Sequence, residues 1–271
     1  MKFSVLMSVY NKENPDYLRL SLESILVDQS VIPTEVVLVE DGPLTDELYI
    51  VLEDFKSRYS FLKTISLKSN VGLGLALNEG LKHCRFDWVA RMDSDDIAIK
   101  TRFEEQLKFI KSNPTIDIVG GGIDEFLDSI DEIVSHKSVP TQHDEIVKMA
   151  KRRNPLCHMT VMFKKERVEK AGGYLALPYV EDYYLWVRMI ATGAKLSNID
   201  KTLVYARVGN GMFNRRGNKE QITSWKVLNQ YMMQQKLVSP LEVFINQIYI
   251  RLFVYMPASV KKVIYGKVLR K

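Results

Sequence analysis

The 271-residue sequence lacks the features that would place it in or across a membrane. It contains no uncharged, apolar stretch of about 18 or more residues, which argues against a membrane-spanning helix. Residues 1–11 also lack the charged start and long apolar run of a signal peptide. We therefore expect a cytosolic chain.

Cysteine is scarce, and its placement excludes two further classes. Cys84 and Cys157 are the two cysteines; they lie far apart and form no CxxC pair. The sequence therefore predicts neither a disulfide framework nor a zinc site.

Acidic residues are scarce in the last fifth of the chain. From Arg215 onward, 11 Lys or Arg residues accompany only Glu220 and Glu242, giving a net charge of +9, whereas residues 1–214 carry −4. Basic charge can attract nucleic acid, but no recognition motif accompanies it, so we expect no nucleic-acid partner.

The first hundred residues alternate strand-like and helix-like patterns. Strand-like runs at 2–10, 34–42, 62–68 and 86–93 are separated by single segments with helical spacing. This order predicts βαβ units in an α/β protein, with a mainly parallel sheet covered by helices on both faces. Ligands bind such sheets beyond the carboxyl ends of the strands, and three strand-like runs end in polar side chains.

The segment "RMDSDD" carries three carboxylates, of Asp93, Asp95 and Asp96, within four residues. Two carboxylates at a strand end can bind Mg²⁺ or Mn²⁺, which take their remaining ligands from water and phosphates. A calcium-binding loop is disfavoured because Ala98 replaces its required glycine. A simple cap of the following helix by residues 94–96 stays open as an alternative.

Six segments, in order and in register over about the first 210 residues, resemble one known family. They are "SVYN" (8–11), "VEDG" (39–42), "NVGLGLALNEGL" (70–81), "ARMDSDD" (90–96), "NPLCHMTVMF" (154–163) and "EDYYLWVR" (181–188). Together they resemble the inverting glycosyltransferases of family 2, which have the GT-A fold, a Rossmann-like mixed sheet flanked by helices. The resemblance is to bacterial enzymes that add sugars to exopolysaccharide and O-antigen (lipopolysaccharide) repeat units.

The resemblance implies a donor site for a nucleotide-sugar, most simply a UDP-sugar. Asp41 would hydrogen-bond the base, Asp93 would approach the ribose or sugar, and Asp95, with Asp93, would ligate Mn²⁺ or Mg²⁺ on the diphosphate. The donor-binding residues that it implies are Val9, Tyr10, Asn11, Asp41, Asn70, Gly72, Asp93, Ser94 and Asp95. The sequence departs from the family at Pro43, where a serine is usual.

The resemblance also implies an acceptor site. Asp182, preceded by Glu181, would be the catalytic base that deprotonates the acceptor hydroxyl. His158 and Glu181 would line the acceptor pocket. Trp186, at helical spacing from Asp182, would form its floor. The residues alone leave open an acidic first turn of a helix, a structural histidine and a tryptophan in the core.

The segment 205–212 departs from the family because it lacks a histidine that relatives use as a third metal ligand. We hypothesise that Arg207, Arg215 or Arg216, near a glycine-rich basic loop, closes over the diphosphate, since guanidinium groups match phosphate geometry.

The C-terminal segment combines apolar and aromatic residues with lysine and arginine. It predicts a helical, basic, amphipathic extension (215–271) after a catalytic domain (1–214), whose nucleotide-sugar half is about 1–100 and acceptor half about 101–214. The extension would lie on the inner face of the cell membrane as a peripheral contact, next to a lipid-linked glycan acceptor. A helical hairpin packed on the catalytic domain or on a homodimer partner is the alternative.

Single-sugar transfer is favoured over processive synthesis, because Ser224 replaces the arginine of the Gln-x-x-Arg-Trp motif of processive synthases. A sugar-phosphate nucleotidyltransferase should show a glycine-rich phosphate loop near its N-terminus, and residues 8–16 show none. A non-catalytic nucleotide-binding module would keep Asp95 without depending on Asp182.

Overall fold

The computed structural model describes residues 1–209 and 218–257. A nine-stranded mixed sheet forms its centre, in the order β3-β2-β1-β4-β8-β6-β9-β5, with β7 paired to β6. The strands are β1 (Ser4–Val9), β2 (Glu35–Glu40), β3 (Leu62–Ser66), β4 (Trp88–Arg91), β5 (Ile97–Ala98), β6 (Ile118–Phe126), β7 (Ile133–Lys137), β8 (Met162–Lys164) and β9 (Leu196–Arg207).

The first four strands form the parallel βαβ part that the sequence predicts. β1 pairs in parallel with both β2 and β4, and β2 pairs in parallel with β3. The single crossover helices are α1 (Pro15–Leu26), α2 (Asp46–Arg58) and α3 (Leu73–His83). Thr45 caps α2 as expected, since its side chain accepts a hydrogen bond from the backbone N–H of Leu48.

The second half of the sheet is mixed rather than parallel. β8 is antiparallel to β4 and to β6, β9 is parallel to β6, and β5 is antiparallel to β9. The remaining helices of this half are α4 (Arg102–Ser112), α5 (His143–Ala150), the 3₁₀ turn η1 (His158–Thr160), α6 (Lys165–Lys170) and α7 (Glu181–Ala191). This order brings the end of β9 beside β5, directly after the acidic cluster.

Helices cover both faces of the sheet. One hydrophobic core joins the sheet to α1, α2 and α4, and a second joins its other face to α3, α6 and α7. Their apolar stripes recur at helical spacing, as in Leu18, Leu22 and Ile25 of α1, all of which are fully buried. The rigid three-layer frame leaves the carboxyl ends of β1, β2 and β4 open at one edge.

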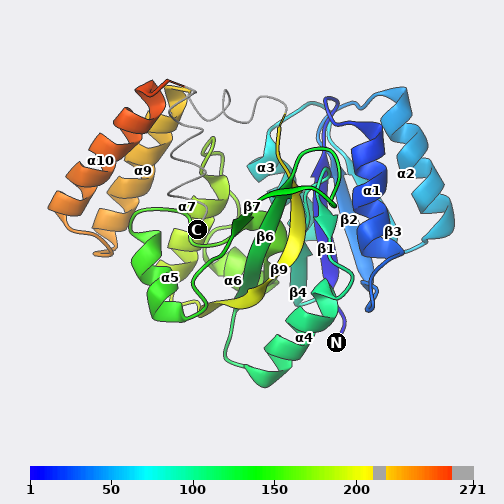
Figure 1. Cartoon of the computed structure of the whole chain (residues 1–271), viewed down its shortest axis with the longest axis horizontal. Helices are drawn as coiled ribbons and strands as arrows, with labels where there is room; N and C mark the ends of the chain where they lie inside the picture. Colours follow the sequence, from blue (N-terminus) through cyan, green and yellow to red (C-terminus); the bar gives the residue numbers. More distant parts are fainter. Residues whose placement is uncertain (210–217, 258–271) are drawn as a thin grey trace.

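The C-terminal helices α9 (Glu220–Gln234) and α10 (Pro240–Tyr255) lie side by side at the end of the molecule opposite α1 and α2 (Figure 1). A third core, which includes Val187 of α7 and Leu228 of α9, packs α9 against α7. Asn246 of α10 is buried and donates hydrogen bonds to the side chain of Asn229 and to the carbonyl of Lys151. Among the helices of the described residues, none is long and apolar enough to cross a membrane.

The boundary at residue 214 falls within residues 210–217, which lie outside the described residues. The division into a catalytic domain and an extension therefore stays a prediction.

Gly80 allows α3 to approach the sheet closely, and this contact positions the segment before α3. A Cβ atom at Gly80 would lie 2.5 Å from Val39 Cγ2 and 2.6 Å from Leu6 Cδ1. We expect Gly80→Val to lower the free energy of unfolding by roughly 1–3 kcal/mol through overpacking, measured by urea denaturation. Glu79→Val, at the neighbouring half-buried position, serves as the control for helix propensity and should cost less than about 1 kcal/mol. Equal midpoints for the two variants would contradict the close contact.

Candidate active site

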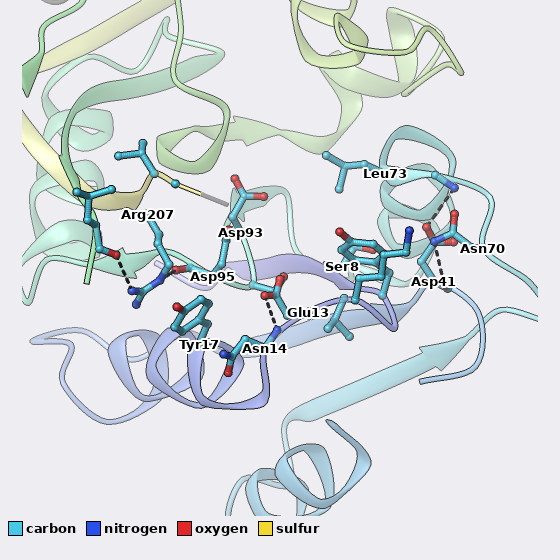
Figure 2. Close-up of a pocket in the computed structure, with 18 of the residues that line it drawn as sticks. Ser8, Glu13, Asn14, Tyr17, Asp41, Asn70, Leu73, Asp93, Asp95 and Arg207 are labelled. Carbon is cyan, nitrogen blue, oxygen red and sulfur yellow. Dashed lines mark hydrogen bonds between the residues drawn. The ribbon is translucent and has the colours of Figure 1, made fainter. Parts of the chain in front are cut away.

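A cavity of about 590 Å³ opens at the carboxyl ends of β1, β2 and β4. Its walls include eight of the nine predicted donor-binding residues: Val9, Tyr10, Asp41, Asn70, Gly72, Asp93, Ser94 and Asp95. Asn11 is exposed and is not among the lining residues. The sheet therefore gathers at one edge the polar segments that are separated in the sequence (Figure 2).

Asp41 fixes one end of this cavity. Its buried carboxylate accepts hydrogen bonds from the backbone N–H groups of Val71, at 2.7 Å, and Gly72, at 3.1 Å, while the side chain of Asn70 donates to its carbonyl. Gly72 has a φ of +88°, a conformation that favours glycine. Asp41 thus holds residues 70–72 in a fixed turn against the cavity.

The acidic cluster does not cap a helix, so that alternative is wrong. Asp96 is followed by the short strand β5, and α4 begins only at Arg102, with Thr101 at its N-cap. Asp96 is buried, and its Oδ1 accepts a hydrogen bond from the backbone N–H of Arg207 at 2.8 Å. The cluster is therefore held by strand pairing between β5 and β9.

Burial and mutual repulsion act on these carboxylates. Burial, followed by the charges of Asp93 and Glu13, raises the pKa of Asp95 to about 7. Burial, with the charges of Asp95 and Asp93, also raises the pKa of Asp96. A cation bound beside these carboxylates would offset both the burial and the mutual repulsion that raise these pKa values.

Arg91 is the buried cation that partly balances this charge. It ends β4, its side chain is 1% exposed, and its guanidinium forms an ion pair with Asp93 Oδ1. A second buried arginine, Arg102, donates to the Arg91 carbonyl at 2.6 Å. The sequence alone suggested no role for Arg91; in the structure it balances the charge of Asp93.

The residues present fit a divalent cation held jointly with a phosphate ligand. Within residues 1–209 and 218–257, no group of three His, Cys, Asp or Glu side chains could hold a metal ion alone. Asp93 and Asp95 nevertheless provide oxygen ligands in a negative environment beside the cavity. Mg²⁺ and Mn²⁺ are commonly bound by one or two carboxylates together with substrate phosphates and water.

A second cavity, of about 600 Å³, adjoins the first. Both are lined by Asp93, Asp95, Arg207 and Val208, and the second also by Asn154, His158 and Asp182. Gln221 and Trp225 of α9 and Phe253 of α10 contribute to its wall. The acidic cluster therefore lies where the two cavities meet.

Asp182 lies in the first turn of α7 and faces the second cavity. Its Oδ2 accepts a hydrogen bond from the side-chain amide of Asn154 at 2.6 Å. Burial raises the pKa of Asp182, and the hydrogen bond from Asn154 opposes that shift. Glu181 instead packs on α3, since a Cβ atom at Gly74 would lie 3.2 Å from its Cγ.

His158 lines the second cavity, whereas Trp186 does not. His158 Nε2 lies 2.9 Å from the hydroxyl of Tyr174, and burial, followed by the charge of Arg91, lowers its pKa, so the ring is neutral. Trp186 is fully buried, with its ring centre 5.9 Å from that of His158. The expectation of Trp186 as an exposed floor is thus corrected: core packing, the alternative, describes it.

Arg207 is fixed at the junction of the cavities. Its guanidinium stacks on the rings of Tyr17, at 3.8 Å, and Phe126, at 4.4 Å, and donates to the carbonyls of Asp95 and Leu127. Figure 2 shows Arg207 beside Asp95 and above Tyr17. Arg215 and Arg216, the other predicted cations, lie outside the described residues.

Sequence reasoning missed several lining residues of the first cavity. They are Ser8, Lys12, Glu13, Asn14, Tyr17, Leu73, Leu127, Asp128, Val208 and Gly209. Five of them lie at or just after the end of β1, and the polar run "SVYNKEN" was the available signal for most of these. Leu127 and Asp128 follow β6, whose position beside β9 only the fold reveals.

Comparisons with known proteins identify the family of this chain. The family described as "Glycosyl transferase family 2" matches residues 4–170. The chain belongs to this family. The resemblance noted from the sequence motifs is therefore confirmed, as is the assignment of the protein as a glycosyltransferase.

Three curated relatives align with most of the chain. An uncharacterised glycosyltransferase of Haemophilus influenzae is 46% identical over 274 residues and covers all of both chains. The amylovoran biosynthesis glycosyltransferase AmsE of Erwinia amylovora is 39% identical, covering 82% of each chain. The UDP-Gal:alpha-D-GlcNAc-diphosphoundecaprenol beta-1,3-galactosyltransferase of Escherichia coli is 37% identical, covering 100% of this chain and 97% of its own.

Solved structures show the same fold at low sequence identity. S. aureus TarS has a TM-score of 0.66 at 20% identity; the match covers 99% of this chain but 46% of TarS, so the chain spans about half its length. TarS 1–349 in complex with UDP-GlcNAc (TM-score 0.64, 20% identity) covers 94% of this chain and 70% of its own. The mannosyltransferase PcManGT of Pyrobaculum calidifontis, in complex with GDP-Man and Mn²⁺, has a TM-score of 0.64 at 15% identity. This match covers 98% of this chain and 75% of PcManGT. The predicted GT-A fold is thereby confirmed.

Arg91 provides a test of charge balance in the cluster. Arg91→Met leaves Asp93 without its buried partner, so we expect the free energy of unfolding to fall by about 3 kcal/mol at neutral pH, measured by urea denaturation. Arg58→Met removes a half-exposed ion pair with Asp54 and should cost less than about 1 kcal/mol. If both variants lost the same small amount, Arg91 would not balance the cluster.

Proposed function

We propose that this glycosyltransferase transfers one sugar, with inversion, from a UDP-sugar to a lipid-linked oligosaccharide in bacterial surface polysaccharide biosynthesis. The observation that carries the proposal is the meeting of two cavities at Asp93 and Asp95, with Asp182 in the second. The names of the Erwinia and Escherichia relatives support an exopolysaccharide or O-antigen type of product, a UDP-sugar donor and a diphosphoundecaprenol-linked acceptor.

The first cavity would bind the donor. The turn that Asp41 holds at residues 70–72 would form a wall for the base, and Asp93 and Asp95 would hold a divalent cation. When bound, such a cation neutralises the negative charge on the departing nucleoside diphosphate. The complex of PcManGT with GDP-Man and Mn²⁺ supports this use of a metal. Arg207, held by stacking at the junction, adds a fixed positive charge near the leaving group.

The second cavity would bind the acceptor. The acceptor hydroxyl oxygen attacks the anomeric carbon, the bond from that carbon to the diphosphate oxygen breaks, and the hydroxyl proton passes to Asp182. Because attack and departure occur on opposite faces, the anomeric configuration inverts. The raised pKa of Asp182 makes its carboxylate a stronger base.

We further propose that transfer is non-processive and takes place at the inner face of the membrane. Gln221 and Trp225 line the second cavity, but Ser224, between them in sequence, is buried and carries no charge. Processive synthases of the same family carry an arginine at this position, in a Gln-x-x-Arg-Trp motif.

The proposal predicts the effect of removing the base. With a panel of UDP-, GDP- and dTDP-sugars, Mn²⁺ and a diphosphate-lipid acceptor, we expect a UDP-sugar to give a product of inverted configuration, read by NMR. Asp182→Asn should lower kcat/KM by about 10²–10⁴ while leaving UDP affinity unchanged. Asp144→Asn, in the exposed first turn of α5, is the matched control and should retain activity. Full transfer by Asp182→Asn would show that another group is the base.

The hydrogen bond from Asn154 predicts a pH effect. Asn154→Ala removes a donor that stabilises the Asp182 carboxylate, so the pKa of Asp182 rises further. Since the base acts as a carboxylate, kcat/KM falls as pH drops through that pKa. A hydrogen bond to a charged group is worth roughly 1.5–3 kcal/mol, so we expect the acidic limb to move up by about 1–2 pH units.

The control for this experiment is Asn113→Ala, which removes a hydrogen bond to Phe109 at the end of α4 and should leave the profile in place. If the pH profile of Asn154→Ala coincided with that of the wild type, the hydrogen bond from Asn154 would not influence the pKa of Asp182.

A further inference from the structure

Helix α10 is apolar on two opposite faces. Its inner face, with Asn246, Ile250 and Val254, is buried against the rest of the molecule. Five large side chains form the opposite face, which we call the outer stripe: Leu241, Phe244, Ile248, Leu252 and Tyr255. Their spacing of three and four residues places them on one side of the helix, and they are 42% to 67% exposed. A helix with apolar side chains on opposite faces is normally covered on both.

The outer stripe faces away from the rest of the protein. Figure 1 shows α10 as the outermost helix at its end of the molecule, with α9 beside it. Only Glu242 and Arg251 are charged within α10. An exposed apolar surface of this extent marks an interaction site rather than ordinary surface.

A group of basic residues adjoins the start of α10. Lys148, Lys151, Arg152 and Arg153 line a cavity of about 540 Å³ together with two acids, Glu145 and Glu242. Hydrogen bonds from Ser239, and then the positive charges of Lys151 and Arg152, lower the pKa of Glu242. Lys151 is joined to α10 through the hydrogen bond from Asn246 to its carbonyl. We call these four residues the basic cluster. Further along the sequence, residues 258–271 contain five Lys or Arg and no acid.

We propose that the outer stripe and the basic cluster together dock on an anionic lipid bilayer. This deepens the proposed function and rests on it for the lipid-linked acceptor. Apolar and aromatic side chains enter the boundary between headgroups and acyl chains, and nearby Lys and Arg residues attract anionic lipids. A second copy of the chain fits less well, because a symmetric contact places identical basic surfaces next to each other.

Docking in this way places the acceptor cavity beside the lipid surface. Arg153 lines both the basic cavity and the second cavity, and Phe253 of α10 lines the second cavity from the adjoining side. A glycan anchored in the bilayer by a diphosphate would therefore reach Asp182 without leaving the membrane surface. Docking in this orientation would favour lipid-linked acceptors over free glycans.

The test is co-sedimentation of the full-length protein with phosphatidylcholine vesicles that contain or lack phosphatidylglycerol. We expect binding only to the anionic vesicles. Phe244→Ser with Leu252→Ser should weaken it at least tenfold, since each removes exposed apolar area. Lys151→Gln with Arg152→Gln should weaken it by about 25-fold, on about a fivefold loss for each charge, and less so at high salt.

Matched controls lie at the opposite end of the molecule on α1 and α2. Leu20→Ser with Ile50→Ser removes two exposed apolar side chains, and Lys56→Gln with Arg58→Gln removes two exposed charges. Both should bind vesicles like the wild type. Circular dichroism melting curves verify that all variants are folded.

Three results would overturn the proposal. One is unchanged vesicle binding by both test pairs. Another is equal binding to vesicles with and without phosphatidylglycerol. The third is a wild-type dimer that Phe244→Ser with Leu252→Ser dissociates in analytical ultracentrifugation, which would assign the outer stripe to a second copy.

Failure of the docking proposal is distinguishable from failure of the proposed function. Vesicle binding needs no substrate, so it can be lost in the variants even if no UDP-sugar is used. Conversely, activity on a detergent-solubilised lipid acceptor without vesicle binding would leave the function intact and remove the docking surface.

Discussion

The ion pair between Arg91 and Asp93 is the contact on which the site depends. Four acids gather there, namely Glu13, Asp93, Asp95 and Asp96, and Arg91 is the buried cation that forms an ion pair with one of them. Its charge also reaches His158, where it adds to the lowering of the pKa by burial, and Asp182, where it opposes the rise of the pKa that burial causes. A single buried arginine at the end of β4 therefore sets the electrostatics of both cavities, and the remaining negative charge is available for a metal ion.

Much of the frame was predictable because it depends on local patterns. Alternating strand and helix periodicity gave the βαβ order, and Thr45 showed the start of α2. Polar side chains at the ends of β1, β2 and β4 were predicted to converge because parallel strands end at one edge. Eight of the nine residues predicted to bind the donor do line the cavity there.

The rest depended on contacts between residues far apart in the sequence. The sequence around Asp96 suggested a helix cap. In the structure Asp96 instead precedes β5, whose pairing with β9 brings it beside Arg207, 111 positions away in the sequence. Trp186 has helical spacing from Asp182, yet the tight packing of α7 on the sheet buries it. Neither outcome can be predicted from the neighbouring sequence. The sequence of a helix shows which face is apolar, but not which part of the protein packs against that face.

Asn246 determines which of the two apolar faces of α10 is buried. Since α10 is apolar on opposite sides, the hydrophobic effect alone would allow either face to pack inward, with little difference in free energy. The amide of Asn246 finds its partners, Asn229 and the Lys151 carbonyl, in one rotation of the helix only, and burying it unpaired would be costly. One polar group thus fixes the rotation of α10 about its own axis, as a buried asparagine fixes the register of a coiled coil. It selects which apolar face becomes core and which remains outside.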